Sequence, residues 1–326
     1  MSASPALGGL REQISSDLVT LAYRVLVVAL LCVLLASLSS AFLTPSNLLN
    51  VLRQASLVFL LASGLTLVIL TAGLDLSVGA NVGLSACLAA TAIKATGSVG
   101  AGVAACLASG AAVGVINGLL VTLLRIPPFI ATYGMLWMLH GLTYWYMAGD
   151  TIHGFPPGFR ALGSGYLLGI PIPIYLMLAF LAAGGLFTRY TTYGREIYAI
   201  GANAEAARLS GIPVRMRLNL VYTLSGAMAG LAAIVYLARL NSAEADIGEP
   251  LTLPAVAAVL IGGTSLFGGV GSLSGTLVGA IILALVLNGM NLLAIDANWQ
   301  PMVTGVVVLL AVWIDIITRQ RVGSRA

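Results

Sequence analysis

Long apolar runs joined by short polar connections make up most of the chain, and their lengths predict membrane-spanning helices. A helix needs about 20 apolar residues to cross the hydrocarbon core of a bilayer. The stretches without a charged residue are 25–52, 54–74, 76–93, 95–124, 126–149, 161–188, 218–238, 250–295 and 297–314. The stretch 250–295 is too long for one helix, and its Gly262-Gly263 and Gly268-Gly269 pairs indicate where it breaks. We therefore expect an all-α polytopic membrane protein with about ten transmembrane helices.

Composition supports this class and excludes several others. Only 8% of residues are charged and mean hydropathy is +1.03, whereas soluble domains have roughly 25% charged residues. The 38 glycines lack the Gly-X-Y period of collagen and match the glycine content of membrane helices. Cys32, Cys87 and Cys106 lie within apolar stretches, which favours small buried side chains over a disulfide framework. The net charge of +4 is scattered and forms no patch for nucleic acid.

The distribution of basic residues predicts the orientation, because cytoplasmic loops of membrane proteins are enriched in Lys and Arg. Residues 189–217 form the longest polar connection and carry five arginines, so we place this segment in the cytoplasm. Counting spans outward leaves four of the 15 basic residues outside, namely Arg53, Lys94, Arg160 and Arg239. Residues 1–24 and 319–326 are then cytoplasmic, and 25–318 form the transmembrane domain. No cleavable signal peptide is expected in residues 1–24.

Asp75 is the one acidic residue well inside an apolar region, in the sequence Gly73-Leu-Asp-Leu-Ser-Val-Gly79. A carboxylate at membrane depth costs several kcal/mol unless it is paired, hydrated or neutralised. Neighbouring glycine and serine favour a broken helix, and broken helices at this depth usually line a cavity. Three interpretations remain open. The segment is a short loop between the second and third spans that reaches cytoplasmic water, or Asp75 receives backbone N–H groups at the start of the third span, or Asp75 contacts the substrate.

A second break is predicted at 262–269. Each break is followed by glycines four residues apart, Gly79 and Gly83 in one case and Gly271, Gly275 and Gly279 in the other. This spacing lets helix backbones approach closely, and the two breaks resemble an internal repeat of hairpins that point toward the cytoplasm. Similar stripes occur at 110–118 and 226–230, where we expect plain helix packing. Amide side chains lie within or near the spans, where they either bridge helices or line a pore: Asn117, Asn288 and Asn291.

The sequence lacks the motifs of an enzyme. The one lysine, Lys94, follows Ile93, so no Gly-Lys of a Walker A loop exists. His140 and His153 are the two histidines, and they form no His-Glu-x-x-His zinc motif. No connection is long enough for a soluble domain. We expect no catalytic residue, cofactor or metal in this chain, and we expect ATP and Mg²⁺ to bind to a separate subunit.

The cytoplasmic connection contains one short predicted helix. Asn203 is a favourable N-cap, Glu205 lies in the first turn, and Gly211 ends the helix before Pro213. A helix of about eight residues is unstable alone in water, so we expect it to dock onto something. The alternative is a surface helix packed on its own loop. We interpret Ala206-Ala207 as an exposed, low-profile face outside any core.

Several motifs together resemble one family, the membrane permease subunits of ribose-type ABC sugar importers. They match in order and in approximate spacing across about residues 45–318. The motifs are GLDLSVG at 73–79, GREIYAIG at 194–201 with Asn203, AARLSGI at 206–212, GGTSLFGG at 262–269 and NGMNLL at 288–293.

The resemblance implies a permease homodimer in the bacterial inner membrane, a cytoplasmic ATPase and a periplasmic sugar-binding protein. It also implies that residues 203–211 are the coupling helix that docks on the ATPase. We assign to this coupling helix Asn203, Glu205, Ala206, Ala207, Arg208 and Gly211. We assign to the substrate pathway Asp75, Ser77, Asn81, Thr264, Ser265, Phe267 and Asn288, although these motifs also suit a role in pore shape.

The expected function is import of a monosaccharide, such as a pentose, a hexose or a polyol. Import of nucleosides or branched-chain amino acids is the alternative within ABC permeases. An ion-coupled secondary transporter is the alternative outside them, but such proteins usually carry paired intramembrane acids or a cation site.

Overall fold

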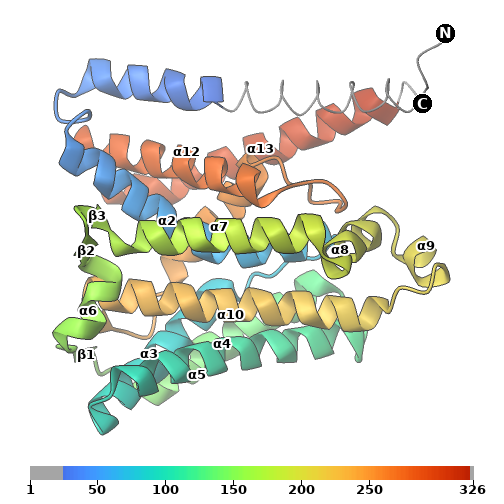
Figure 1. The fold of residues 1–326 in the computed structure, drawn as a ribbon, viewed down its shortest axis with the longest axis horizontal. Helices are drawn as coiled ribbons and strands as arrows, with labels where there is room; N and C mark the ends of the chain where they lie inside the picture. Colours follow the sequence, from blue (N-terminus) through green and yellow to red (C-terminus); the bar gives the residue numbers. More distant parts are fainter. Residues whose placement is uncertain (1–24, 324–326) are drawn as a thin grey trace.

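The computed structural model describes residues 25–323, so the predicted N-terminal segment 1–24 and residues 324–326 lie outside the described part. The described chain is a bundle of long helices (Figure 1). In chain order, the long elements are a helix over Val25–Leu38 and then α2 Pro45–Leu70, α3 Val78–Thr96, α4 Val99–Thr122, α5 Pro128–Met147, α7 Ile172–Tyr190, α10 Val214–Leu240, α11 Thr252–Ile261, α12 Leu273–Leu292 and α13 Gln300–Gly323.

Six of the helices in the described chain are long and apolar enough to cross a membrane, namely α2, α3, α4, α7, α10 and α12. This confirms the predicted all-α polytopic membrane class. The helix over Val25–Leu38, α5, α11 and α13 do not meet the same criteria over their full length. The prediction of ten spans therefore depends on these four elements.

Short strands and helices lie at the two ends of the bundle (Figure 1). At one end, β1 (Ile152–His153) pairs antiparallel with β4 (Ser242–Ala243), and β2 (Tyr166–Leu167) pairs antiparallel with β3 (Ile170–Pro171). We call this the sheet end; it also holds α6 (Pro157–Ser164), η1 (Glu249–Leu251) and η2 (Ala297–Trp299). The opposite end, which we call the loop end, holds α8 (Thr192–Ala202) and α9 (Ala204–Leu209).

The four basic residues predicted on the external side belong to elements of the sheet end. Arg53 hydrogen-bonds to the hydroxyl of Tyr166 in β2, and Lys94 Nζ donates to the Gly154 carbonyl at 2.8 Å. Arg160 lies in α6 and Arg239 in the last turn of α10. The arginine-rich segment 189–217 lies at the loop end, so the structure separates the two sets as the charge pattern predicts.

Both predicted glycine-rich breaks lie between helices. α2 ends at Leu70 and α3 begins at Val78; α11 ends at Ile261 and α12 begins at Leu273. In the second connection Gly263, Gly268 and Gly269 have φ of 79°, 81° and 74°, a region that glycine enters without steric cost. We call residues 71–77 the first turn and residues 262–272 the second turn.

The glycine stripes of α4 and α10 bring these helices into backbone contact. A Cβ atom at Gly114 would lie 2.3 Å from the carbonyl oxygen of Tyr222, and one at Gly226 would lie 2.2 Å from that of Gly110. The predicted role of these stripes as packing surfaces is confirmed. α10 also packs against α2 and α3, so it occupies the centre of this part of the bundle.

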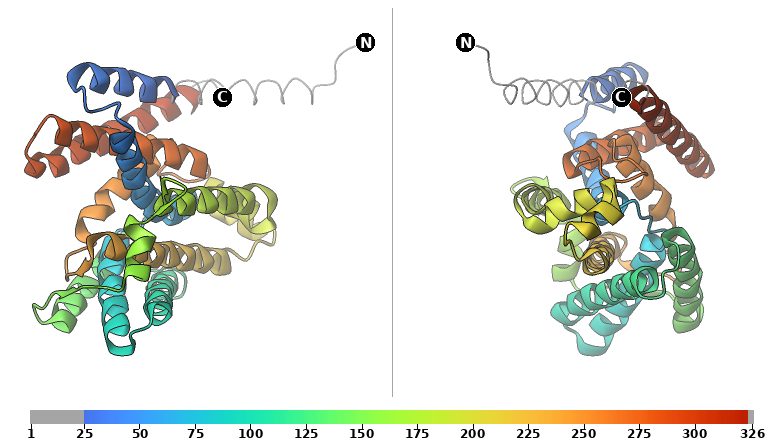
Figure 2. Two further views of the ribbon diagram at one scale, coloured as in Figure 1. Left: turned by 60° about the vertical axis from the view of Figure 1, so that its left-hand side comes forward. Right: turned by 90° about the vertical axis from the view of Figure 1, so that its right-hand side faces the viewer.

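The bundle divides into two groups of helices with α2 between them. Two further views place α12, α13 and the helix over Val25–Leu38 on one side, and α3, α4 and α5 on the other (Figure 2). The cavity described below lies between these two groups.

Candidate transport site

A cavity of about 900 Å³ lies between the two helix groups, toward the sheet end. Its walls come from α2, α3, α5, α10, α11, α12 and α13 and from the connection before α11. The volume lies within the range of small-molecule sites, roughly 300–1,000 Å³. Most of the lining is apolar. The polar and aromatic side chains that line it are Gln54, Tyr133, Trp137, His140, Tyr236, Arg239, Asp246, Glu249, Thr252, Gln300 and Thr304.

The carboxylates of this cavity come from the connection between β4 and α11. Asp246 and Glu249 are exposed, and neither forms an ion pair with a residue whose side chain the structure describes. Arg239 lines the same cavity without an ion pair to a described residue. The orientation predicted from the basic residues puts this acidic connection outside, and no pattern in its sequence indicates that it folds over a cavity.

Asp75 is buried in the first turn, with 1% of its surface exposed. Its Oδ1 accepts from the Ser77 backbone N–H at 3.0 Å and from Ser77 Oγ at 2.7 Å; its Oδ2 accepts from Ser225 Oγ at 3.1 Å. Asn117 Nδ2 in turn donates to Ser77 Oγ at 2.8 Å. The carboxylate therefore fixes the start of α3 through a turn of the Asx type and joins it to α10, while Ser77 joins it to α4. Asp75 thus accepts a backbone N–H at the start of α3, as one of the interpretations predicted. That the connection 71–77 forms a short loop reaching cytoplasmic water stays a prediction.

The other predicted pathway residues are mostly buried as well. Asn81 Nδ2 donates to the Gly110 carbonyl at 3.2 Å, and Asn288 exchanges two amide hydrogen bonds with Asn47 at 3.1 and 2.8 Å. Bridging by amides, one of the two roles predicted for Asn117 and Asn288, is confirmed at both, and Asn81 forms a similar bridge. Thr264 and Ser265 are buried in the second turn. Phe267, at the tip of that turn, is half-exposed.

None of these seven residues lines the cavity, although Leu76, Gly79, Ala80 and Leu287 beside them do. Leu76 and Gly79 belong to the motif at 73–79, whereas no residue of the motif at 262–269 lines the cavity. The motif residues that face the cavity are neighbours of the seven, because the polar members of the motifs hold helices together. Substrate contact by the seven residues stays a prediction.

The end of α2, the second turn and α8 meet at the loop end. The Gly269 N–H donates to the Leu70 carbonyl at 2.9 Å, and the Tyr198 hydroxyl of α8 donates to the Gly271 carbonyl at 2.9 Å. A Cβ atom at Gly201 of α8 would lie 1.8 Å from the Leu70 oxygen and 2.4 Å from the Gly269 nitrogen. We call this contact the glycine junction.

α8 is also fixed to the start of α10. The carboxylate of Glu196 in α8 forms an ion pair with Arg217 in the first turn of α10. The Arg217 guanidinium lies 4.1 Å from the centroid of the Tyr193 ring. α8 is therefore held at the loop end by α10 as well as by the glycine junction.

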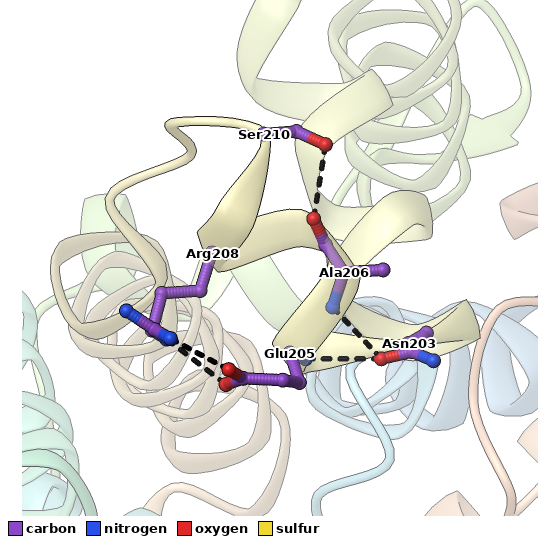
Figure 3. A network of polar contacts seen from close by, with 5 residues as sticks. All are labelled: Asn203, Glu205, Ala206, Arg208 and Ser210. Atoms are coloured by element: carbon purple, nitrogen blue, oxygen red, sulfur yellow. Dashed lines mark hydrogen bonds and ion pairs between the residues drawn. The ribbon is translucent and has the colours of Figure 1, made fainter.

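α9 has the predicted N-cap (Figure 3). Asn203 Oδ1 accepts from the backbone N–H groups of Glu205 and Ala206 at 3.1 and 2.9 Å. Arg208 donates two hydrogen bonds to the Glu205 carboxylate, at 2.9 and 2.6 Å. These bonds lower the pKa of Glu205 in the exposed loop. Gly211 follows with φ of 85°, so the helix ends where the sequence predicted, although it is six residues long rather than about eight.

The predicted exposed face at Ala206-Ala207 was wrong for Ala207. Its side chain is buried with 5% exposure, while Ala206 is exposed. The chain reverses at Gly211 and the Ile212 N–H donates to the Ala207 carbonyl at 3.1 Å, which turns Ala207 inward. The exposed apolar side chain of α9 is instead Leu209, at 72% exposure.

Comparison with known proteins identifies the family. A family model described as "Branched-chain amino acid transport system / permease component" matches residues 47–312. The chain belongs to this permease family. The ribose import permease protein RbsC of Escherichia coli (strain K12) is 44% identical over 290 residues, which cover 87% of this chain and 90% of the relative.

Two further relatives agree. RbsC of Bacillus subtilis (strain 168) is 43% identical over 88% of this chain and 89% of its own length. The L-arabinose ABC transporter permease protein AraH of Azospirillum brasilense is 36% identical over 89% of this chain and 86% of its own length. No solved structure matches the chain significantly. The resemblance to ribose-type ABC sugar permeases is confirmed, and the chain is a multi-pass protein of the bacterial cytoplasmic (inner) membrane.

Proposed function

We propose that this chain is the pore-forming permease subunit of an ATP-driven importer that moves a monosaccharide into the cytoplasm. The observation that carries the proposal is the similarity along most of the chain to permeases named for ribose and L-arabinose. The cavity supports it, because about 900 Å³ accommodates one sugar molecule among apolar and polar side chains. A ribose-like pentose, a hexose or a polyol all belong to this class of cargo.

The proposed orientation puts the loop end in the cytoplasm and the sheet end outside. Eleven of the 15 basic residues then lie inside, in keeping with the positive-inside rule. α13 runs from the sheet end toward the loop end, and the helix over Val25–Leu38 runs toward the sheet end (Figure 1). Ten passes with both termini in the cytoplasm follow from this arrangement, with the two glycine-rich turns on the cytoplasmic side.

The proposed partners are a second permease copy, a cytoplasmic ATPase that binds ATP and Mg²⁺, and a periplasmic sugar-binding protein. The absence of a Gly-Lys pair in the sequence supports an ATP site on another chain. The exposed face of α9, formed by Glu205, Ala206, Arg208 and Leu209, supports docking of the ATPase there.

The proposed mechanism is alternating access without covalent chemistry. Closure of the ATPase on ATP pushes α9, and α8 carries this displacement to the glycine junction. The two turns then shift relative to one another and change the side on which the cavity opens. The backbone contacts around Gly201 support this step, because they contain no flexible side chain that would absorb the movement.

Reconstitution in liposomes tests the proposal. The permease with its cognate ATPase and binding protein should accumulate radiolabelled ribose, arabinose or galactose. Accumulation should require ATP on the side of the membrane where the ATPase lies. Accumulation of leucine in place of sugars would favour import of branched-chain amino acids, the alternative that the description of the family model supports. Accumulation of uridine would favour import of nucleosides. Sugar uptake by the permease alone under a proton or sodium gradient would instead establish a secondary transporter.

A further inference from the structure

We infer that Trp137 and Tyr133 of α5, together with Asp246 and Glu249, form the sugar-contact site of the cavity, and that this site accepts neutral sugars and disfavours anionic ones. The inference rests on the proposed function and adds the residues and the charge class of the cargo. The four residues of this site differ from the motif residues considered above, because their side chains face open space, whereas most of the motif residues are buried hydrogen-bond partners.

The aromatic side chains form one wall of the cavity. Tyr133, Trp137 and His140 lie at helical spacing along α5, and all three line the cavity. Their ring centroids are separated by 6.4 Å for Tyr133–Trp137 and 5.8 Å for Trp137–His140, so each ring supports the next. Trp137 nevertheless keeps 57% of its surface exposed. A supported aromatic ring with an accessible surface is suited to receive a flat ligand.

Sugar rings match such a wall. One face of a pyranose or furanose carries several C–H groups with partial positive charge, and the face of an aromatic ring is negative. An aliphatic amino acid offers no comparable flat face. The aromatic wall therefore favours a cyclic sugar over the branched-chain amino acids named in the family description.

The carboxylates supply the polar contacts and the charge selection. An ionised carboxylate only accepts hydrogen bonds, and hydroxyl groups that donate to it make stronger bonds than those between neutral groups. Neither carboxylate forms an ion pair with any of the described side chains. Arg239 is the one arginine or lysine that lines the cavity, so the ionised lining carries one positive and two negative groups. A phosphorylated or carboxylated sugar would meet net repulsion.

Saturation-transfer NMR on the purified permease–ATPase complex tests the contact directly. With D-ribose as the probe, the ring C–H protons should receive saturation from the wild-type protein, and D-ribose 5-phosphate should give a several-fold weaker signal. Trp137→Leu should reduce the ribose signal and ATP-driven ribose uptake by about five- to tenfold, whereas Trp137→Phe should retain most of both. The matched control is Trp145→Leu, because Trp145 is on the same helix, is 78% exposed and does not line the cavity.

The charge selection has its own variants. The double variant Asp246→Asn, Glu249→Gln should weaken the ribose signal several-fold and remove the discrimination against ribose 5-phosphate. Glu244→Gln should change neither, since Glu244 is in the same connection but outside the cavity lining. Unchanged ribose uptake and signal in Trp137→Leu, or persistent discrimination in the double variant, would overturn the inference. Wild-type protein that accumulates no sugar with its partners would instead refute the proposed function.

Discussion

At the scale of single residues, the first turn depends on one carboxylate that accepts hydrogen bonds from three donors and forms no ion pair with a described residue. Asp75 is buried, and its oxygens accept from Ser77 and Ser225. Hydrogen bonds to a charged group contribute about 1.5–3 kcal/mol each to stability, and they satisfy a group whose burial is otherwise costly. Asp75 therefore stabilises the connection between α2 and α3, where the backbone is not helical.

Asp75→Asn should lower the free energy of unfolding by about 2 kcal/mol. The asparagine amide replaces one acceptor oxygen by an NH2 group. This donor would face a hydroxyl that donates to the carboxylate in the wild-type protein, so two donors would meet. Thermal unfolding in detergent measures the change, and ribose uptake should fall with it. The control is Asp296→Asn, where Asp296 accepts from the Asn298 N–H at 2.9 Å in a similar but exposed turn. Equal, small shifts for both variants would contradict the assigned role.

Local residue patterns were predictable where their partners are close in sequence. The Asn203 cap and the helix end at Gly211 follow from three or four neighbouring residues, and both are confirmed. The partner of Asp75 on α10 is 150 residues away, and no local pattern indicates it. The inward orientation of Ala207 was missed for the same reason, since it depends on how the chain returns toward α10.

At the scale of elements, the glycine junction links α2, the second turn and α8 by close backbone contacts and by one side-chain hydrogen bond from Tyr198. By helix propensity alone, alanine is better than glycine by about 1 kcal/mol. At Gly201 that advantage is outweighed, because the new Cβ would lie 1.8 Å from the Leu70 oxygen. Both contacting groups are backbone, so α8 must move away from the turns.

Gly201→Ala should therefore leave ATPase binding intact and reduce sugar uptake at least tenfold. ATP hydrolysis should become less dependent on the loaded binding protein, because α8 no longer follows the turns. The control is Gly185→Ala in α7, where a Cβ atom meets nothing within 4 Å. Full, coupled transport by the Gly201 variant would show that the junction does not transmit movement.

The coupling helix gives a second prediction for an element. Leu209→Glu should weaken ATPase capture and uptake strongly while membrane yield stays normal, because this exposed side chain has no core to support. Leu168→Glu is the control, since Leu168 is 91% exposed at the sheet end. Ala207→Trp should instead destabilise the loop itself, because Ala207 is buried. Normal ATPase capture by the Leu209 variant would exclude α9 as the docking element.

At the scale of the whole molecule, apolar length and charge placement predicted more than the motifs did. The class of fold, the two breaks and the separation of basic residues between the ends follow from them, because a bilayer imposes the same constraints on every segment. The cavity was not predictable. Its lining comes from seven helices, and residues such as Trp137 and Gln300 carry no local mark that distinguishes them from lipid-facing or interfacial positions.

The orientation of the molecule is the last prediction. With the loop end in the cytoplasm, a cysteine at Ser242 should react with a membrane-impermeant maleimide in intact cells, whereas one at Ala204 should react only after the membrane is opened. Both sites are solvent-accessible, Ser242 in β4 at the sheet end and Ala204 at the start of α9. Native Cys87 and Cys106 are buried, and Cys32 is partly buried, so replacing all three by alanine gives a clean background. The reverse labelling pattern would invert the assigned sides, and labelling of both sites from outside would contradict a bundle whose two ends lie on opposite faces of the membrane.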